Sequence, residues 1–187
     1  MTKKERLMLT ARRLFAENGF YGTATARIAK EAEVSNGILF HYFPTKEKLI
    51  RAMYIDVKDR IFDYSLGQVY KGATLKESIY TLWLASVEWY MEHPEDFHFI
   101  RQYESSPYYT IDSELDHRHT QLTLELISEG MEQGIFKTFS AHLLFQIMMK
   151  LVQNAVEYIG QHEILREDFE FRYRLFDVTW DALRKSN

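Results

Sequence analysis

A chain of 187 residues with 46% hydrophobic residues can bury a sizeable core, in one large domain or in a small module joined to a larger one. The absence of cysteine excludes disulfides and thiolate chemistry. The formal net charge of −4 hides an asymmetry, because residues 1–51 hold ten Lys and Arg against five Asp and Glu, whereas the remainder holds thirteen against twenty-two. A basic end on an acidic body is typical of a protein that contacts phosphates through that end.

The chain opens without a charged-then-apolar leader, and its apolar runs are too short to span a bilayer. We therefore expect a cytoplasmic protein with no membrane partner. The first element is a helix that begins with a capping box, Thr2-x-x-Glu5, and stops at Gly19.

Residues 23–46 predict two short helices joined by a tight turn. Ala26, Ile28, Ala29 and Ala32 give the first helix an apolar face of small residues. Ser35 can cap the second helix, which runs from about Asn36 to Phe43 and ends at Pro44. This arrangement is the helix-turn-helix, whose second helix fits the major groove of DNA.

The remaining chain predicts six further helices and no strand. Capping residues and apolar periodicity place them at residues 45–66, 74–93, 94–104, 113–134, 140–160 and 167–185. The expected fold class is all-α, with nine helices.

The N-terminal residues resemble the DNA-binding domain of tetracycline-repressor-like (TetR) regulators over about residues 6–50. The resemblance rests on Leu14 to Phe20, Thr23, Ile28-Ala29, Val34-Ser35, Gly37, Leu39, Tyr42-Phe43 and Thr45 to Leu49, at the spacing of that family without a gap. It implies a three-helix DNA-binding domain over residues 1–46, followed by a six-helix ligand-binding and dimerisation domain over residues 47–187.

The resemblance also implies which residues contact double-stranded operator DNA. Asn36, Gly37 and His41 would face base edges, and the capping residue Ser35 would also contact the DNA. Thr23, Thr25, Tyr42 and Lys46 would contact backbone phosphates. Position 40 departs from the family, which often has a tyrosine there: Phe40 cannot hydrogen-bond a phosphate, and would contact a thymine methyl or a sugar, or simply pack.

The last two helices are apolar around most of their circumference, which favours burial by the core on one side and by a partner on the other. We expect a homodimer built on these helices, as the resemblance also implies; the alternative is that both are entirely core. The stripes assigned to the interface are Leu144, Met148, Leu151 and Ala155 in one helix, and Phe169, Tyr173, Phe176 and Trp180 in the other.

Residues 79–109 are unusually rich in aromatic side chains, most of which core packing would explain. The alternative is that some line an apolar effector pocket. The candidates are Trp83, Trp89, Tyr90, Phe99 and Tyr103, with Ser86, Gln102 and Asn154 as polar groups. A lipophilic cation would suit such a site through cation–π contacts, and a fatty acyl or aromatic ligand fits nearly as well.

The histidine spacing does not favour a metal site. His117 and His119 are two residues apart and His93 and His98 five, so neither pair shares one helix face. No catalytic or cofactor-binding motif is present. The expected function is a ligand-responsive DNA-binding regulator, most simply a repressor. The alternative is a helical ligand-binding or scaffold protein that has lost DNA affinity, which Phe40 favours.

Overall fold

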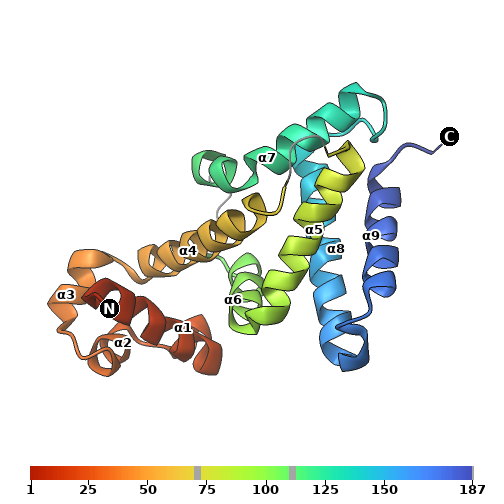
Figure 1. Ribbon diagram of the computed structural model, residues 1–187. Helices are drawn as coiled ribbons and strands as arrows, with labels where there is room; N and C mark the ends of the chain where they lie inside the picture. The colour runs from red at the N-terminus through yellow and green to blue at the C-terminus, as the bar shows by residue number, and fades with distance from the viewer. Residues whose placement is uncertain (70–72, 110–112, 187) are drawn as a thin grey trace. The chain divides into compact units, whose positions relative to one another are not determined.

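The computed structural model describes residues 1–69, 73–109 and 113–186, with backbone alone for residues 113–119 (Figure 1). Nine α-helices and one short 3-10 helix occupy these described residues, so the predicted all-α class is confirmed. The chain forms two compact units. The first contains Met1–Asp59 and His93–Asp112, and the second contains Arg60–Glu92 and Ser113–Asn187.

The first unit holds α1 (Lys3–Gly22), α2 (Thr25–Glu31), α3 (Asn36–Tyr42), the beginning of α4 (Lys46–Leu66) and α6 (Pro94–Glu104). The predicted capping box starts α1, since Thr2 and Glu5 each accept a hydrogen bond from the other's backbone N–H. Gly19 breaks the helical backbone with φ +70°, and α1 ends at Gly22. The predicted stop at Gly19 is thus a break inside the last turns of the helix.

A buried ion-pair network ties α1 to α4 and α6. The Arg12 guanidinium lies 3.0 Å from Asp56 on α4 and 3.1 Å from Asp96 on α6, and the Asp96 side chain is fully buried. Aromatic packing adds to this joint, because the Phe20 ring lies 5.1 Å from Phe15 and 5.7 Å from Phe99. Helix α1 is therefore fixed to α6 by both charge and packing.

The second unit holds α5 (Leu75–Glu92), α7 (Ser113–Glu132), α8 (Ala141–Gln161), the 3-10 helix η1 (Glu163–Leu165) and α9 (Phe169–Leu183). Helix α5 packs against α7, α8 and α9, and its Trp83 is completely buried. Trp180 of α9 lies with its ring 5.0 Å from that of Phe136. Gly130 is required beside that ring, because a Cβ there would come within 2.3 Å of Phe136.

Candidate nucleic-acid interface

Helices α2 and α3 form the predicted helix-turn-helix. Helix α2 ends in a Schellman motif, in which Val34 N–H donates to the Ala29 carbonyl and Glu33 N–H to that of Lys30. Glu33 occupies the left-handed position of this motif, with φ +55°. Ser35 then caps α3 by accepting from Ile38 N–H at 3.3 Å, as the sequence predicts.

The inner side of α3 anchors it to the rest of the unit. Leu39 and the C-cap residue Phe43 are buried, as are Ile28 and Ala29 of α2, and the two helices are in contact. The outer side carries Asn36, Gly37, Phe40 and His41, all exposed and one helical turn apart in pairs. We call these four residues the α3 face.

The fold does not require a glycine at position 37 of the α3 face. A Cβ at this position would meet only Ser35 Oγ, at 3.8 Å, so an alanine would fit sterically. Tyr42 is exposed beside this face, with its ring 5.5 Å from that of His41. These side chains are available to an external ligand.

Thr23 is a correction to the predicted phosphate contacts. Its side chain is fully buried, and its hydroxyl hydrogen-bonds the Leu14 and Gly19 carbonyls at 3.0 and 2.9 Å. Thr23 therefore closes the end of α1 and cannot reach a phosphate in this structure. Thr25 is half-buried at the first position of α2, and its phosphate contact stays a prediction.

Lys46 also has a role inside the chain. Its ammonium donates a hydrogen bond to the Phe20 carbonyl and lies 6.0 Å from the centre of the Phe15 ring. Burial lowers the pKa of this ammonium below its ordinary value. Lys48, one turn into α4, is exposed, which makes it the better placed of the two lysines for a phosphate.

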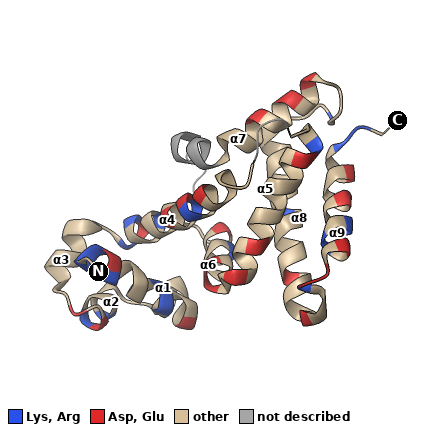
Figure 2. Ribbon diagram, viewed as in Figure 1, with Lys and Arg blue, Asp and Glu red and all other residues tan. Residues whose placement is uncertain are grey.

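Lys and Arg residues lie on several helices of the first unit (Figure 2), and two groups among them differ in their surroundings. In the first group, Arg12 is held by the buried Asp96 and the half-buried Asp56, and Arg13 and Arg27 both pair with Glu31, whose pKa is lowered by the hydrogen bonds from Arg27 and then Arg13. The second group is exposed and makes no ion pair with any residue described in the structure; it comprises Lys3, Lys4, Lys30 and Lys48. Sequence counting alone does not separate the two groups.

Comparison with known proteins decides the family. Residues 7–53 match the family described as bacterial regulatory proteins, tetR family. A solved structure from Shewanella sp. PV-4, described as a tetR family transcription regulator, is 30% identical and superposes with a TM-score of 0.93 over 100% of both chains. The chain belongs to the TetR family. It is accordingly a transcription regulator and not an enzyme.

Two sequence relatives agree with this membership. YuxN of Bacillus subtilis (strain 168), named an HTH-type transcriptional regulator, is 34% identical over 111 residues, which are 59% of this chain but only 38% of YuxN. The chain thus matches well under half the length of that relative. KstR2 of Mycobacterium tuberculosis (strain H37Rv), named an HTH-type transcriptional repressor, is 26% identical over 141 residues, covering 73% of this chain and 70% of KstR2.

The predicted effector residues of this TetR-family protein fall in both compact units. Phe99 and Tyr103 are buried in the first unit, where Tyr103 lies 4.4 Å from the Tyr54 ring, and Gln102 lies beside them on α6. In the second unit Trp83, Ser86 and Tyr90 are buried on α5 and Trp89 is half-buried. Asn154 is a correction, because it is exposed on the outer side of α8.

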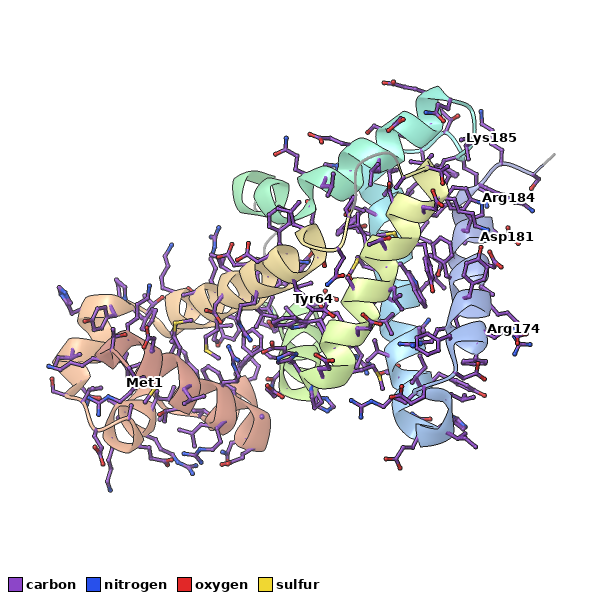
Figure 3. The ribbon with its side chains drawn as sticks, in the orientation of Figure 1. Met1, Tyr64, Arg174, Asp181, Arg184 and Lys185 are labelled. Carbon is purple, nitrogen blue, oxygen red and sulfur yellow. The ribbon has the colours of Figure 1, made fainter. Side chains whose placement is uncertain are left out.

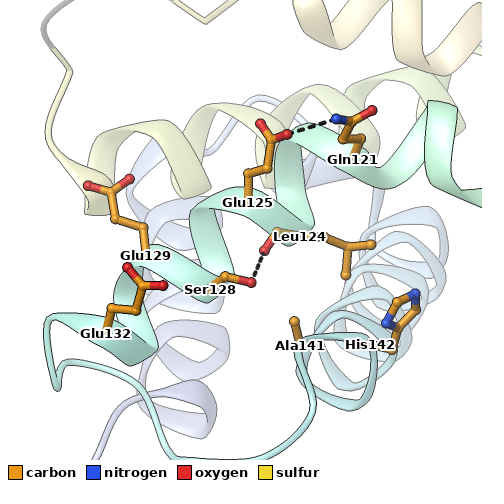
Figure 4. Close-up of a pocket in the computed structure, with 8 residues that line it drawn as sticks. All are labelled: Gln121, Leu124, Glu125, Ser128, Glu129, Glu132, Ala141 and His142. Atoms are coloured by element: carbon orange, nitrogen blue, oxygen red, sulfur yellow. Dashed lines mark hydrogen bonds between the residues drawn. The ribbon is translucent and has the colours of Figure 1, made fainter.

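Two hollows occur at the described surfaces. One of about 340 Å³ lies between α1 and α6 and includes Phe99 and Gln102 in its lining. The other, of about 430 Å³, lies along α7 and the start of α8 (Figure 4). Glu125 and Glu129 line it beside Leu124 and His142, and it contains none of the predicted effector residues.

The predicted dimer residues are mostly core. Leu144, Met148 and Ala155 of α8 are buried inside their own unit, as are Phe176 and Trp180 of α9. Because these positions already pack against the chain's own helices, this part of the predicted interface is corrected. Leu151 is half-buried.

Tyr173 and Phe169 are exposed but lie to one side of α9. The Tyr173 ring lies 5.4 Å from the Lys76 ammonium, which also hydrogen-bonds Asp177 at 2.8 Å, and the Phe169 ring lies under the Arg172 guanidinium at 4.5 Å. Arg174 and Asp181, also on α9, point away from α5 and α8 (Figure 3).

The outer side of α8 and α9 presents a different apolar set. Leu143 and Tyr158 of α8 and Val178 of α9 are exposed, with Ile147 and Phe171 half-buried between them. The Tyr158 and Phe171 rings stack at 5.9 Å, so apolar side chains of the two helices meet at this point of the outer side. We call these five residues the α8–α9 face.

The expectations that the chain has no metal site and no membrane span concern the whole chain, whereas the structure describes only part of it. Among the described side chains no group of three or more His, Asp and Glu could hold a metal ion. His117 and His119 lie outside those side chains. No helix in the described ranges has the length and apolar content needed to cross a bilayer.

Proposed function

We propose that this TetR-family regulator binds a palindromic operator as a homodimer, represses transcription there, and is released by a small apolar or aromatic effector. The observation that carries the DNA part is the α3 face: Asn36, Phe40 and His41 are exposed on an anchored helix whose fold does not need them. Repression is supported by the relative KstR2, which is named a transcriptional repressor, and it needs only occupancy of DNA.

The DNA-contacting residues that we propose are the α3 face with Ser35, Thr25 and Tyr42. Asn36 would bond adenine N6 and N7, and Tyr42 a phosphate. Lys3, Lys4, Lys30 and Lys48 supply exposed positive charge around α3 and are proposed as the phosphate-binding cations. Residues 1–46 would then hold most of the DNA contacts, and residues 47–187 the effector site and the dimer contacts.

Dimerisation is supported by the α8–α9 face. Val178 is 59% exposed and continues the apolar surface formed by Tyr158 and Phe171, and large connected apolar surfaces mark protein interfaces. A two-fold axis through this face would place the same patch on both copies, as a closed dimer requires. Two recognition helices related by that axis match a palindrome with half-sites about one turn of DNA apart.

The effector site that we propose lies on α5. Trp83 is fully buried, yet its Nε1 has no hydrogen-bond partner among the described residues, and a buried donor without a partner is costly unless something else accepts from it. Ser86, Trp89 and Tyr90 lie within two turns of it on the same helix. KstR2 is described as a ketosteroid transcriptional regulator, which favours an apolar ligand of that size for this chain as well.

Release would be a shift between two populations. An effector that binds better to one arrangement of the two recognition helices shifts the dimer toward it, and their spacing no longer matches both half-sites. Reciprocity requires that DNA weakens effector binding by the same factor. These regulatory steps take place in the cytoplasm, where the DNA is.

The test begins with in vitro selection from randomised duplexes by the full-length protein. We expect a palindromic consensus, and Asn36→Ala should relax preference at particular base pairs by about 1–3 kcal/mol. Binding that is equal for all sequences and disappears at modest salt would instead support the scaffold alternative. Androstenedione as a ketosteroid probe, with decanoate as a fatty-acid comparison, then tests whether either raises the melting temperature and lowers operator affinity.

A further inference from the structure

Phe40 is the least explained side chain of the α3 face. It is 45% exposed, although Leu39 before it and Phe43 after it are buried and suffice to anchor the helix. Among the residues that the structure describes, no ring, hydrogen bond or ion pair holds the Phe40 side chain. The role of a packing residue is therefore already taken by its neighbours, and Phe40 is left to face outward.

The surroundings of Phe40 let its ring approach another surface closely. Gly37 lies one turn before it, and no atom other than Ser35 Oγ lies within 4 Å of where a Cβ of Gly37 would be. Asn36, also one turn before, is exposed on the same side. The α3 sequence NGILFHY contains no Lys or Arg, so this helix cannot make the two-pronged guanine contact that Arg and Lys provide.

Among the base edges of the major groove, one group suits the ring. A phenylalanine ring cannot hydrogen-bond a phosphate or a polar base edge. The apolar group that base edges present in this groove is the C5-methyl of thymine, and phenylalanine is among the side chains that contact it. An adenine read by Asn36 through N6 and N7 brings a thymine with it on the opposite strand.

We propose that Phe40 determines operator specificity by contacting the C5-methyl group of a thymine in each half-site. This inference rests on the proposed function, because it assigns one chemical contact within the DNA site. Phe40 excludes water from that methyl group, and Asn36 reads an adenine beside it. The half-site recognised by α3 accordingly has an A·T core.

Deoxyuridine gives a direct test, since it differs from thymidine only in that methyl group. The operator obtained by selection is synthesised with each thymine replaced in turn, in one half-site and in both, and affinities are measured by fluorescence anisotropy with the full-length protein. At one position we expect a loss of about fourfold per half-site and about fifteenfold for both, the value of one buried methyl group. Phe40→Ala should bind the thymine and deoxyuridine duplexes within about twofold of each other.

Two further variants keep the test specific. Phe40→Leu retains an apolar side chain and should keep most of the methyl effect, whereas Tyr42→Phe, a matched change beside the face, should weaken all duplexes equally and leave the methyl effect unchanged. A flat deoxyuridine scan in the wild type, or an equal loss in Phe40→Ala, would overturn the assignment of Phe40 while the consensus still supports the proposed function. Selection that yields no consensus would overturn both.

Discussion

Two surfaces of this protein expose aromatic rings that the chain does not cover, and they differ in what surrounds those rings. On the α3 face Phe40 stands beside an asparagine, a histidine and a glycine on a helix of seven residues. On the α8–α9 face Tyr158 and Phe171 stand beside Leu143, Ile147 and Val178 on two longer helices. Phe40 and Tyr158 are exposed to a similar extent, but the two faces differ in the residues around the rings and in the number of helices that form them.

The difference indicates different partners. A narrow face that mixes one apolar ring with hydrogen-bonding groups suits a groove whose floor presents the same mixture. A broad, connected apolar face suits a second protein surface, where burial of apolar area supplies most of the stabilisation. Substitutions in and around the two faces test whether one binds DNA and the other binds a second protein surface.

The largest expected effect comes from placing a charge in the α8–α9 face. Val178→Glu should convert the dimer to a monomer, because burying a carboxylate without a partner is costly, and operator affinity should fall at least about a hundredfold when the half-sites are bound singly. Sedimentation velocity and anisotropy measure the two effects.

Leu9→Glu is the matched control for that substitution. Leu9 is 58% exposed on α1, against 59% for Val178, so the same change is made outside the face. The Leu9 variant should remain a dimer. Trp180→Glu should differ from both, because Trp180 is buried against Phe136 and the chain itself should unfold. A Val178→Glu protein that sediments as a dimer would show that partners meet elsewhere.

A second prediction removes the support of the α3 face rather than the face itself. Arg12→Met takes the cation away from the fully buried Asp96, and loss of one partner from a buried ion pair lowers the free energy of unfolding by about 3 kcal/mol. Urea denaturation measures this change. Arg27→Met breaks an exposed pair with Glu31 and should cost less than about 1 kcal/mol. Equal effects of the two variants would contradict the expectation that the buried ion pair of Arg12 stabilises the unit more than the exposed pair of Arg27.

The third prediction separates Lys46, which the family resemblance assigns to a phosphate, from the nearby Lys48, which the structure leaves exposed. Lys48→Ala should weaken binding to all DNA sequences and reduce the salt dependence of binding by about one counterion per half-site. Lys46→Ala should chiefly reduce stability, by about 1–2 kcal/mol, because it removes a charged hydrogen bond to the Phe20 carbonyl. Affinity against salt concentration, with parallel denaturation curves, distinguishes them. A reduced salt slope for Lys46→Ala with unchanged stability would return Lys46 to the phosphate contacts.

Local signals made most of the fold predictable from the sequence. The capping box at Thr2 and Glu5 and the caps at Ser35 and Ser140 lie where expected, since each depends on residues three positions apart. Thr45 likewise accepts a hydrogen bond from Lys48 N–H at the start of α4. The exposed positions of α3 were predictable for the same reason, because its apolar residues leave only one side free.

Long-range packing is what the sequence could not supply. Thr23 is buried, and its hydroxyl donates hydrogen bonds to the Leu14 and Gly19 carbonyls. The residues next to Thr23 in the sequence do not predict this burial. Helices α8 and α9 are apolar on two sides, so periodicity finds both stripes without showing which one faces the core. The structure shows that Leu144 of α8 and Trp180 of α9 face the core, whereas Tyr158 and Val178 do not.

The smallest expected effect concerns the turn that presents the α3 face. Glu33 has φ +55°, a left-handed backbone that costs most residues about 1–2 kcal/mol and glycine almost nothing. Replacing Glu33 by glycine removes this backbone cost, but the greater freedom of glycine in the unfolded chain offsets part of the stabilisation. Glu33→Gly should therefore raise the free energy of unfolding by about 0.5–1 kcal/mol in urea denaturation. Glu33→Ala keeps the unfavourable backbone and loses the same weak pairing with Arg6 at 3.7 Å, so it should give no gain. If alanine stabilised the protein as much as glycine, the relief would come from removing the carboxylate and not from the backbone. Operator affinity should stay the same in the glycine variant, because the turn changes its strain and not its path.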